Sequence, residues 1–389
     1  MDIVKNPYYN IIRYVIILTG QSQYHSKWLN IWIKSLFFLV ILSFIITQIA
    51  GMIKVFDNID LVLMCIPPTC YASMGATIFI NNILKVKQMN VVFWKIQNDW
   101  DTLTSKHEVD ILHKYGRKCR FYSMIFAFGL FGNLSNFVFL HFSTLMRNTL
   151  KNNNEPSQLL FLTDFGIDSE KYFYLILLHN YLSASICTAV IVNGDIVLLM
   201  FLEHACGVFE IIGNKLTSAI KENSNSTNNV NFRKKLQQEI KLCVSMHRRV
   251  LLYVNDVQSV FSTAYLFVFG LSIIDLSITG VQSVMSKNNP EEAIRFGFYT
   301  MCQVFHIFLL TLPPQQLLDS SLSLPIYIYN TDWYYLSTET KKMLLLIMKR
   351  GSQPTTFIVG KIFIPSLQFF TKVLQTSLSY FTVLISVRG

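Results

Sequence analysis

Seven apolar stretches constrain this chain more than any other feature of its sequence. A hydrocarbon layer of about 30 Å takes roughly 20 apolar residues in a helix that rises 1.5 Å per residue. The chain is therefore predicted to cross a lipid bilayer as seven helices. The predicted spans are residues 35–53, 61–80 (with Pro67 and Pro68 inside), 121–141, 172–202, 260–281, 296–318 (with Pro313 and Pro314 near its end) and 363–387.

The composition agrees with a membrane protein and not with a water-soluble enzyme. Apolar residues make up 52% of the 389 residues and charged residues only 14%, and the mean hydropathy is +0.39. The fold class is therefore predicted to be all-α, an integral membrane protein with seven transmembrane helices. The short apolar patch at residues 11–18 carries Arg13 and lacks a cleavage-site pattern, so no secretory signal is expected before the first span.

The positions of lysine and arginine predict the orientation of the helices. Loops on the N-terminal side hold 25 of these residues and loops on the opposite side hold seven, while Lys372 lies within the last span. Cytoplasmic loops retain positive charge, so the N-terminus is expected in the cytoplasm and the C-terminus outside the cell. This orientation is opposite to that of a G-protein-coupled receptor.

The orientation divides the chain into predicted segments. The fourth span is longer than a bilayer requires, so its end is expected to project into water as a continued helix. The segments are a cytoplasmic N-terminal segment at 1–34, spans one to four at 35–202, a cytoplasmic extension and loop at 203–259, spans five and six at 260–318, a cytoplasmic anchor segment at 319–362 and helix seven at 363–389.

The inner loop after the fourth span contains two amphipathic patterns. Their spacing of three or four residues is typical of helices with one apolar face. Such helices either lie along the membrane surface or pack with other cytoplasmic helices into a bundle, and the Tyr- and Trp-containing stretch 319–361 favours the bundle. The apolar positions are Phe209, Ile212, Leu216 and Ile220, followed by a low-complexity NSNSTNNVN segment and then by Leu236, Ile240, Cys243 and His247.

Catalytic, metal-binding and nucleic-acid-binding patterns are missing from the sequence. Four residues separate Glu108 from His113, which differs from the HExxH spacing that places two zinc ligands one helical turn apart. The sequence has no GxxxxGK[ST] loop, no GxSxG elbow and no paired CxxC, and none of the seven cysteines lies in an outer loop. The net charge of +10 follows the inner loops. We therefore expect no enzyme activity, cofactor, metal, disulfide framework or nucleic-acid partner.

The last span carries a stripe of polar residues along one side. In lipid such a stripe has no use, whereas a helix that faces a water-filled path requires one. The alternative is that these hydroxyls and amides only form hydrogen bonds with neighbouring helices. The stripe consists of Gln368, Thr371, Lys372, Gln375, Ser379, Thr382 and Ser386.

Several motifs toward the C-terminus resemble those of the insect odorant receptor family. One departure from the family pattern is Pro314, where many relatives carry a glycine in the turn that ends helix six. The motifs are Ser321, YNTDWYYL from Tyr329 to Leu336, KKMLLLIMKRGSQP from Lys341 to Pro354, the pair Gly360 and Lys361, and the terminal SYFTVL.

The resemblance implies a function. Members of this family are ligand-gated, non-selective cation channels built as tetramers, in which an odour-binding subunit pairs with a shared co-receptor subunit and four copies of helix seven line the pore. We therefore expect an odour-specific subunit in the plasma membrane, in dendrites of olfactory sensory neurons. Its expected partners are the co-receptor in a heterotetramer, a small volatile odorant, membrane lipid and permeating cations.

The resemblance also implies the positions of a gate and a pocket. Val383 and Val387 match the hydrophobic constriction of relatives, Ser379 and Ser386 lie on the pore-facing stripe, and Arg388 lies at the outer mouth or serves as an interfacial anchor. The odour pocket is expected in the outer half of the membrane. Its candidate residues are Met64, Cys70, Tyr71, Phe131, Ser135, Phe139, Tyr174, Leu178, Tyr181, Ile273, Phe298, Tyr299 and Cys302.

Two alternative functions follow from the same layout. One is a channel similar to a gustatory receptor that acts without a co-receptor. The other is a seven-helix receptor that signals through a cytoplasmic partner, against which the distribution of positive charge argues.

Overall fold

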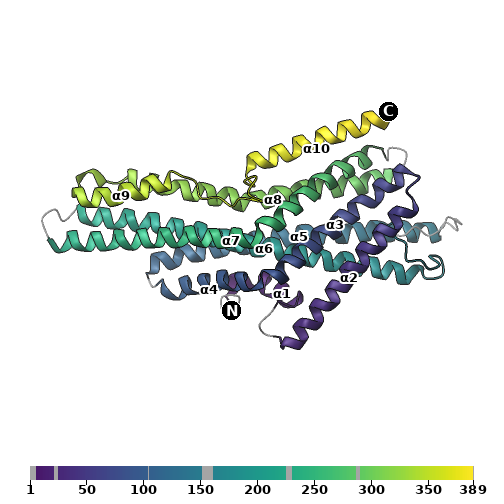
Figure 1. The fold of residues 1–389 in the computed structure, drawn as a ribbon, viewed down its shortest axis with the longest axis horizontal. Coiled ribbons are helices and arrows are strands. Elements are labelled where there is room, and N and C mark those ends of the chain that lie inside the picture. Colours follow the sequence, from purple (N-terminus) through teal and green to yellow (C-terminus); the bar gives the residue numbers. More distant parts are fainter. Residues whose placement is uncertain are drawn as a thin grey trace.

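A computed structural model describes residues 6–21, 25–103, 105–150, 161–224, 230–285 and 290–388 as an elongated bundle of long helices (Figure 1). Within these residues, the extended chain forms only an isolated antiparallel bridge between Val359 and Phe363. The helices are η2 (Pro7–Tyr9), α1 (Asn10–Leu18), α2 (Lys27–Lys54), α3 (Ile59–Leu84), α4 (Val86–Thr102), α5 (Lys106–Leu150), α6 (Phe173–Ser224), α7 (Val230–Met285), α8 (Pro290–Tyr329), η4 (Trp333–Tyr335), α9 (Thr338–Gly351) and α10 (Leu367–Arg388).

The helices confirm the expected all-α membrane fold. Among the described residues, six helices are both long and apolar enough to cross a bilayer, namely α2, α3, α5, α6, α7 and α8. The seventh predicted span corresponds to α10, whose 22 residues reach about 33 Å at 1.5 Å per residue. α10 is not among those six helices, and its polar stripe lowers its apolarity.

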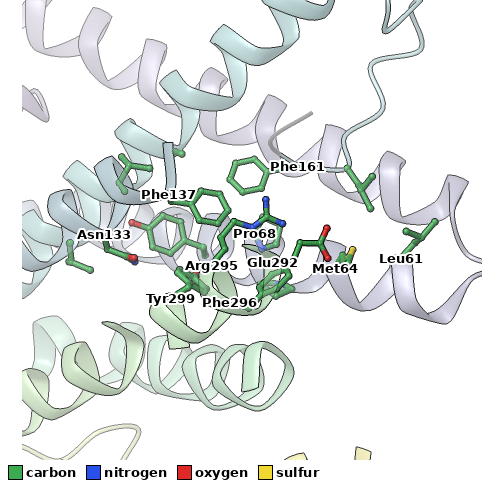
Figure 2. A pocket seen from close by; sticks show the side chains of 16 residues that line it. Leu61, Met64, Pro68, Asn133, Phe137, Phe161, Glu292, Arg295, Phe296 and Tyr299 are labelled. Carbon is green, nitrogen blue, oxygen red and sulfur yellow. The ribbon is translucent and has the colours of Figure 1, made fainter. Parts of the chain in front are cut away.

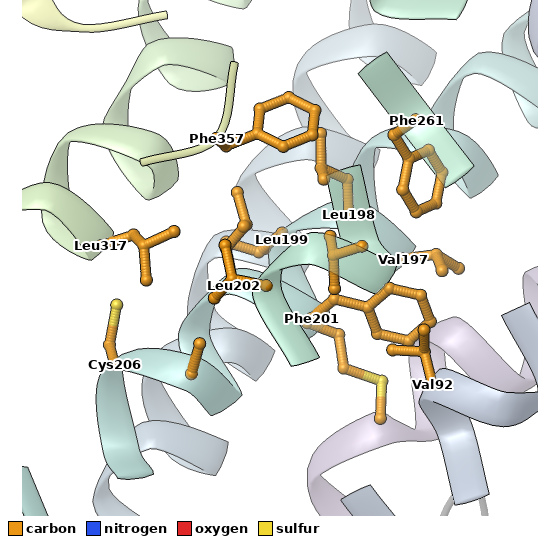
Figure 3. Close-up of a cluster of buried hydrophobic side chains, with 14 of the residues drawn as sticks. Val92, Val197, Leu198, Leu199, Phe201, Leu202, Cys206, Phe261, Leu317 and Phe357 are labelled. Carbon is orange, nitrogen blue, oxygen red and sulfur yellow. The ribbon is translucent and has the colours of Figure 1, made fainter. Parts of the chain in front are cut away.

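α6 is the central helix of the bundle. In its most apolar stretch, 94% of the residues are buried, and it packs against α2, α3, α5, α7 and α8. A helix that is apolar on every side is buried, either among other helices or in lipid, and α6 lies among other helices. Figure 3 shows this core, in which α6 contributes Val197, Leu198, Leu199, Phe201, Leu202 and Cys206, and Val92, Phe261, Leu317 and Phe357 come from the surrounding segments.

α6, α7 and α8 continue far beyond the predicted spans and form, with α9, a distal bundle. The two amphipathic segments expected in the inner loop are helical, but they are direct continuations of α6 and α7 and not separate helices. Their apolar residues share one buried core with Leu324, Ile328, Leu344 and Ile347, as the bundle hypothesis predicted. Burial, together with the positive charge of Arg350, lowers the pKa of His247 in this core to about 4.

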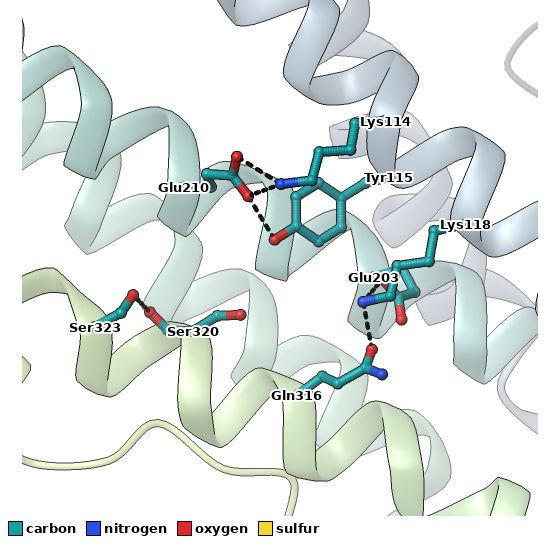
Figure 4. Close-up of polar contacts among 8 residues, drawn as sticks. All are labelled: Lys114, Tyr115, Lys118, Glu203, Glu210, Gln316, Ser320 and Ser323. Carbon is teal, nitrogen blue, oxygen red and sulfur yellow. Dashed lines mark hydrogen bonds and ion pairs between the residues drawn. The ribbon is translucent and has the colours of Figure 1, made fainter.

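Charged and polar side chains of α5, α6 and α8 contact one another beside the buried core (Figure 4). Glu203 of α6 is buried and lies 3.1 Å from the ammonium of Lys118 on α5, which also donates to Gln316 of α8 at 2.6 Å. One turn earlier on α5, Lys114 contacts Glu210 at 2.8 Å. These polar contacts join α5, α6 and α8 near the predicted inner membrane face.

The predicted segment boundaries at 202/203 and 318/319 fall inside α6 and α8. Since no break in either helix marks these boundaries, they remain predictions.

α3 contains two prolines without being interrupted. Pro67 has no N–H to donate to the carbonyl of Leu63 four residues earlier. The side-chain amide of Gln282 on α7 donates to that carbonyl at 2.8 Å. A neighbouring helix thus satisfies the backbone group that the proline leaves free, which is how membrane helices tolerate such residues.

A candidate ligand pocket and a polar helix

A cavity of about 400 Å³ lies between α3, α5, α6 and α8, at the end of the bundle where α3 and α8 begin (Figure 2). Its volume falls within the range of about 300–1,000 Å³ that is typical of pockets for small molecules. Most of the lining is apolar or aromatic. The lining residues are Leu61, Met64, Pro67, Pro68, Tyr71, Leu130, Asn133, Leu134, Phe137, Phe161, Leu162, Ala184, Glu292, Arg295, Phe296 and Tyr299.

The two tyrosine hydroxyls of the cavity are bound to neighbouring helices. The Thr188 hydroxyl donates to the carbonyl of Ala184 at 2.8 Å, so in the 2.7 Å contact with Tyr71 the tyrosine is the donor. The Tyr299 hydroxyl donates to the Asp275 carboxylate on α7 at 3.2 Å, and Gln303 donates to the same carboxylate oxygen. These hydrogen bonds hold the two tyrosine side chains in place at the cavity surface, and they use the hydroxyl protons that a ligand could otherwise bind.

Two charged side chains from the first turns of α8 also line the cavity. Glu292 and Arg295 are three residues apart and therefore lie on one face of the helix. The guanidinium carbon of Arg295 lies 5.5 Å from the ring centre of Phe137 and 5.1 Å from that of Phe296. Sequence reasoning placed Arg295 only among the outer cations. Arg295 lies one helical turn before Tyr299, a predicted pocket residue, and this spacing could have identified Arg295 as a pocket residue as well.

The segment that precedes α6 closes one side of the cavity. Phe161 stacks on Phe137 with ring centres 5.8 Å apart, and the backbone N–H of Asp164 donates to the carbonyl of Thr47 on α2 at 3.1 Å. A hydrogen bond from the backbone N–H of Gly166, together with Lys54 at 3.2 Å, holds the pKa of Asp164 below its usual range. We call residues 161–164 the lid segment.

The predicted pocket residues divide into four groups in the structure. Met64, Tyr71 and Tyr299 line the cavity, whereas Phe298 and Cys302 line a separate cavity of about 260 Å³ between α5 and α8. Phe139, Tyr174 and Leu178 are exposed on the outside of the bundle. The others line neither cavity: Cys70 is buried, Ser135 is exposed, Phe131 and Ile273 are partly buried, and Tyr181 bonds to His141 at 2.9 Å.

For some helices, the side predicted to line the pocket is rotated around the helix axis from the side that lines it in the structure. On α5 the lining positions are Leu130, Asn133, Leu134 and Phe137, whereas the prediction used 131, 135 and 139. Both sets have helical spacing, but Phe139 is about 200° around the helix from Phe137 at 100° per residue. Apolar residues fill every side of a membrane helix, so the pattern alone does not show which side faces the cavity.

α10 packs against the bundle through one face only. Val373 and Ser377 are buried, and Phe370 packs on Phe308 of α8 with ring centres 5.5 Å apart. Figure 1 shows α10 along one edge of the molecule, diverging from its neighbours toward the C-terminus. The whole polar stripe is exposed in this chain, namely Gln368, Thr371, Lys372, Gln375, Ser379, Thr382 and Ser386.

Hydroxyl groups in the stripe donate their protons to the helix that carries them. Ser379 donates to the carbonyl of Gln375 at 2.9 Å, Thr382 to that of Ser379 at 2.8 Å, and Ser386 to that of Val383 at 2.9 Å. The free electron pairs of these oxygens remain as acceptors, which suits contact with cations. Val383 is 56% exposed beside them, while the side chains of Val387 and Arg388 lie outside the described part.

Comparisons with known proteins agree on one family. A family model described as 7tm Odorant receptor matches residues 58–378. Odorant receptor Or2 of Anopheles gambiae is 29% identical over 146 residues, covering 38% of each chain. Odorant receptor 10 of Aedes albopictus is 30% identical over 148 residues, covering 38% of this chain and 39% of its own. Each alignment thus spans less than two fifths of the relative.

One solved structure has the same fold over nearly the whole length. It is the olfactory receptor OR5 of Machilis hrabei in complex with eugenol, which aligns with a TM-score of 0.82 at 14% sequence identity. The alignment covers 98% of this chain and 100% of the other. At this identity the match establishes the fold alone.

Proposed function

This chain belongs to the seven-transmembrane odorant receptor family, and from that premise we propose that it is the odour-binding subunit of a ligand-gated, non-selective cation channel. A small volatile molecule occupies the cavity between α3, α5, α6 and α8, and the pore is lined by α10 from four subunits. A co-receptor subunit completes the heterotetramer. The complex acts in the plasma membrane of olfactory sensory neurons, with its C-terminus outside the cell.

The observation that carries this proposal is the exposed polar face of α10. In a lone chain within lipid, polar side chains such as Gln368 and Gln375 would lack hydrogen-bond partners, which is costly in hydrocarbon. Assembly of several copies around an axis places these faces on a shared water-filled path. The fold match to the Machilis hrabei receptor, which was solved in complex with eugenol, supports a cavity for a small volatile ligand.

The contacts between the cavity and α10 supply a route for gating. Tyr299 lines the cavity and bonds to Asp275 of α7. α7 and α8 both pack on α10, through Phe269 against Phe369 at 5.2 Å and Phe308 against Phe370 at 5.5 Å. A ligand that binds more tightly to the arrangement with α10 displaced outward shifts the population toward the open pore.

The proposal is tested by recording membrane current. Cells that express this chain with a co-receptor subunit are expected to show a prompt cation current on exposure to active volatiles, and that current persists when G proteins are blocked. Cells that express this chain alone are expected to show none. A current without the co-receptor would indicate an independent channel, and a response that disappears when G proteins are blocked would contradict direct gating.

Val383→Asn is expected to raise the resting current of the co-expressed channel severalfold. Val383 lies about 40° around α10 from Ser379 at 100° per residue, on the face assigned to the pore. An amide side chain at the constriction that the Val383 positions of the four subunits form would bind water and keep the pore hydrated. Whole-cell current without odorant measures the effect. Leu374→Asn, about 180° away on the same helix and half-buried against the bundle, is the matched control and should leave the resting current unchanged. Equal resting currents in wild type and Val383→Asn would contradict the gate assignment.

A further inference from the structure

Arg295 lines the cavity without a complete set of hydrogen-bond partners. Its Nε is buried and meets no acceptor in the described part of the chain. The rings of Phe137 and Phe296 lie against its guanidinium, as cation–π partners do. Figure 2 shows the group beside the rings of Phe137 and Phe161. Aromatic rings are poor acceptors, so the N–H groups at the edge of the guanidinium are what this side chain can offer to a ligand.

The rest of the lining offers a ligand few other hydrogen-bond donors. The hydroxyl protons of Tyr71 and Tyr299 are already donated to Thr188 and Asp275. Asn133 lines the cavity, and its Oδ1 is buried without a donor. Arg295 is therefore the strongest hydrogen-bond donor that faces the cavity.

Glu292 determines which acceptors suit this site. It lines the same cavity one turn before Arg295, and its charge acts on Arg295 although the two groups form no direct ion pair within 4 Å. A carboxylate ligand beside Arg295 would be repelled by Glu292 across an apolar cavity, where charges are weakly screened. A neutral carbonyl oxygen accepts a charge-assisted hydrogen bond from Arg295 and carries no net charge for Glu292 to repel.

We infer that Arg295 is the polar anchor of this cavity, which therefore selects volatile molecules with a neutral carbonyl group on an apolar body, such as ketones, aldehydes and esters. The inference rests on the proposed function, because it assigns a ligand class to the pocket of that channel. The carbonyl oxygen accepts from the guanidinium. The apolar body lies against side chains such as Pro68, Leu130 and Leu134.

Matched probes test this inference on wild type and on Arg295→Met, which keeps an unbranched apolar stem at this position but removes the charge and the donors. The carbonyl probes are 2-octanone and methyl benzoate, and their hydrocarbon counterparts are octane and ethylbenzene. Octanoate tests for an anionic ligand. Two readouts are taken: the current of the channel co-expressed with a co-receptor subunit, and the ligand-induced rise in thermal stability of the purified protein. Lys171→Met, which removes an exposed cation outside the cavity, is the matched control.

In wild type and Lys171→Met, at least one carbonyl probe is expected to act at roughly tenfold lower concentration than its hydrocarbon counterpart, as a charge-assisted hydrogen bond allows. In Arg295→Met this advantage is lost while the hydrocarbon response remains. Equal responses to carbonyl and hydrocarbon probes in wild type, an unchanged preference in Arg295→Met, or a stronger response to octanoate would each overturn the inference. A stability shift that follows the expected pattern without any current would support the ligand class and contradict only the channel proposal.

Discussion

Asp195→Ala is expected to lower the stability of the folded chain by about 3–5 kcal/mol, the usual cost of removing one partner from a buried charged group. The carboxylate of Asp195 on α6 is fully buried. It accepts from the Tyr265 hydroxyl of α7 at 2.7 Å and lies 2.8 Å from Nε2 of His306 on α8. Alanine leaves both partners unsatisfied inside the bundle and removes the contact that joins three helices. The melting temperature of the protein purified in detergent measures the loss.

Two comparison variants separate the role of Asp195 from a general effect of substitution. Asp195→Asn keeps an acceptor for Tyr265 and a polar group beside His306, so we expect less than half of the loss. Asp256→Ala removes a carboxylate that pairs with Lys95 while 41% exposed, and such surface pairs contribute only about 0–1 kcal/mol. A similar loss in Asp195→Ala and Asp256→Ala would show that the buried contacts do not hold the three helices together.

Gly51→Ala is expected to reduce odorant sensitivity at least tenfold, as an order of magnitude for a displaced pocket wall. A Cβ at this position of α2 would lie 2.2 Å from the carbonyl oxygen of Leu162 and 2.9 Å from its carbonyl carbon. Both atoms belong to the backbone of the lid segment, so a side-chain rotation cannot relieve the clash. Leu162 and the neighbouring Phe161 line the cavity, and both must move. The odorant concentration that gives half-maximal current measures the effect.

Gly132→Ala is the control for this experiment. A Cβ on Gly132 of α5 meets no atom within 4 Å, so alanine there should leave sensitivity unchanged and slightly favour the helix. Both variants must reach the cell surface in similar amounts for the comparison to hold. If Gly51→Ala responds like wild type, the lid segment does not shape the ligand site.

Much of the fold was predictable because length and apolarity alone define a membrane helix. The span predicted at 61–80 lies within α3, and the helical continuation predicted for the fourth span is present in α6, which extends to Ser224. The projection of this continuation into water stays a prediction. The continuity of α7 with the second amphipathic segment was not predicted. Polar residues such as Asn214 and Glu222 lie on α6, whose apolar face is buried in the distal bundle.

The candidate site was predictable only in part, because it depends on helix rotation and on contacts between distant residues. Tyr71 and Tyr299 were identified since large aromatic residues in the outer halves of the spans are natural candidates. Phe161 belongs to a loop with no helical pattern, and its place beside Phe137 depends on how the lid segment packs against Gly51. No local feature of the sequence encodes that packing.

The enclosure of α6 has a consequence for how the molecule can move. This helix has 52 residues, about 78 Å at 1.5 Å per residue. Neighbouring helices pack against it along most of this length. Because this packing holds α6 in place, a ligand bound at one end does not bend it locally. The surrounding helices must instead rotate or slide past α6 as rigid bodies. A small displacement of such a helix at one end of the protein then becomes a larger displacement of the same helix at the other end.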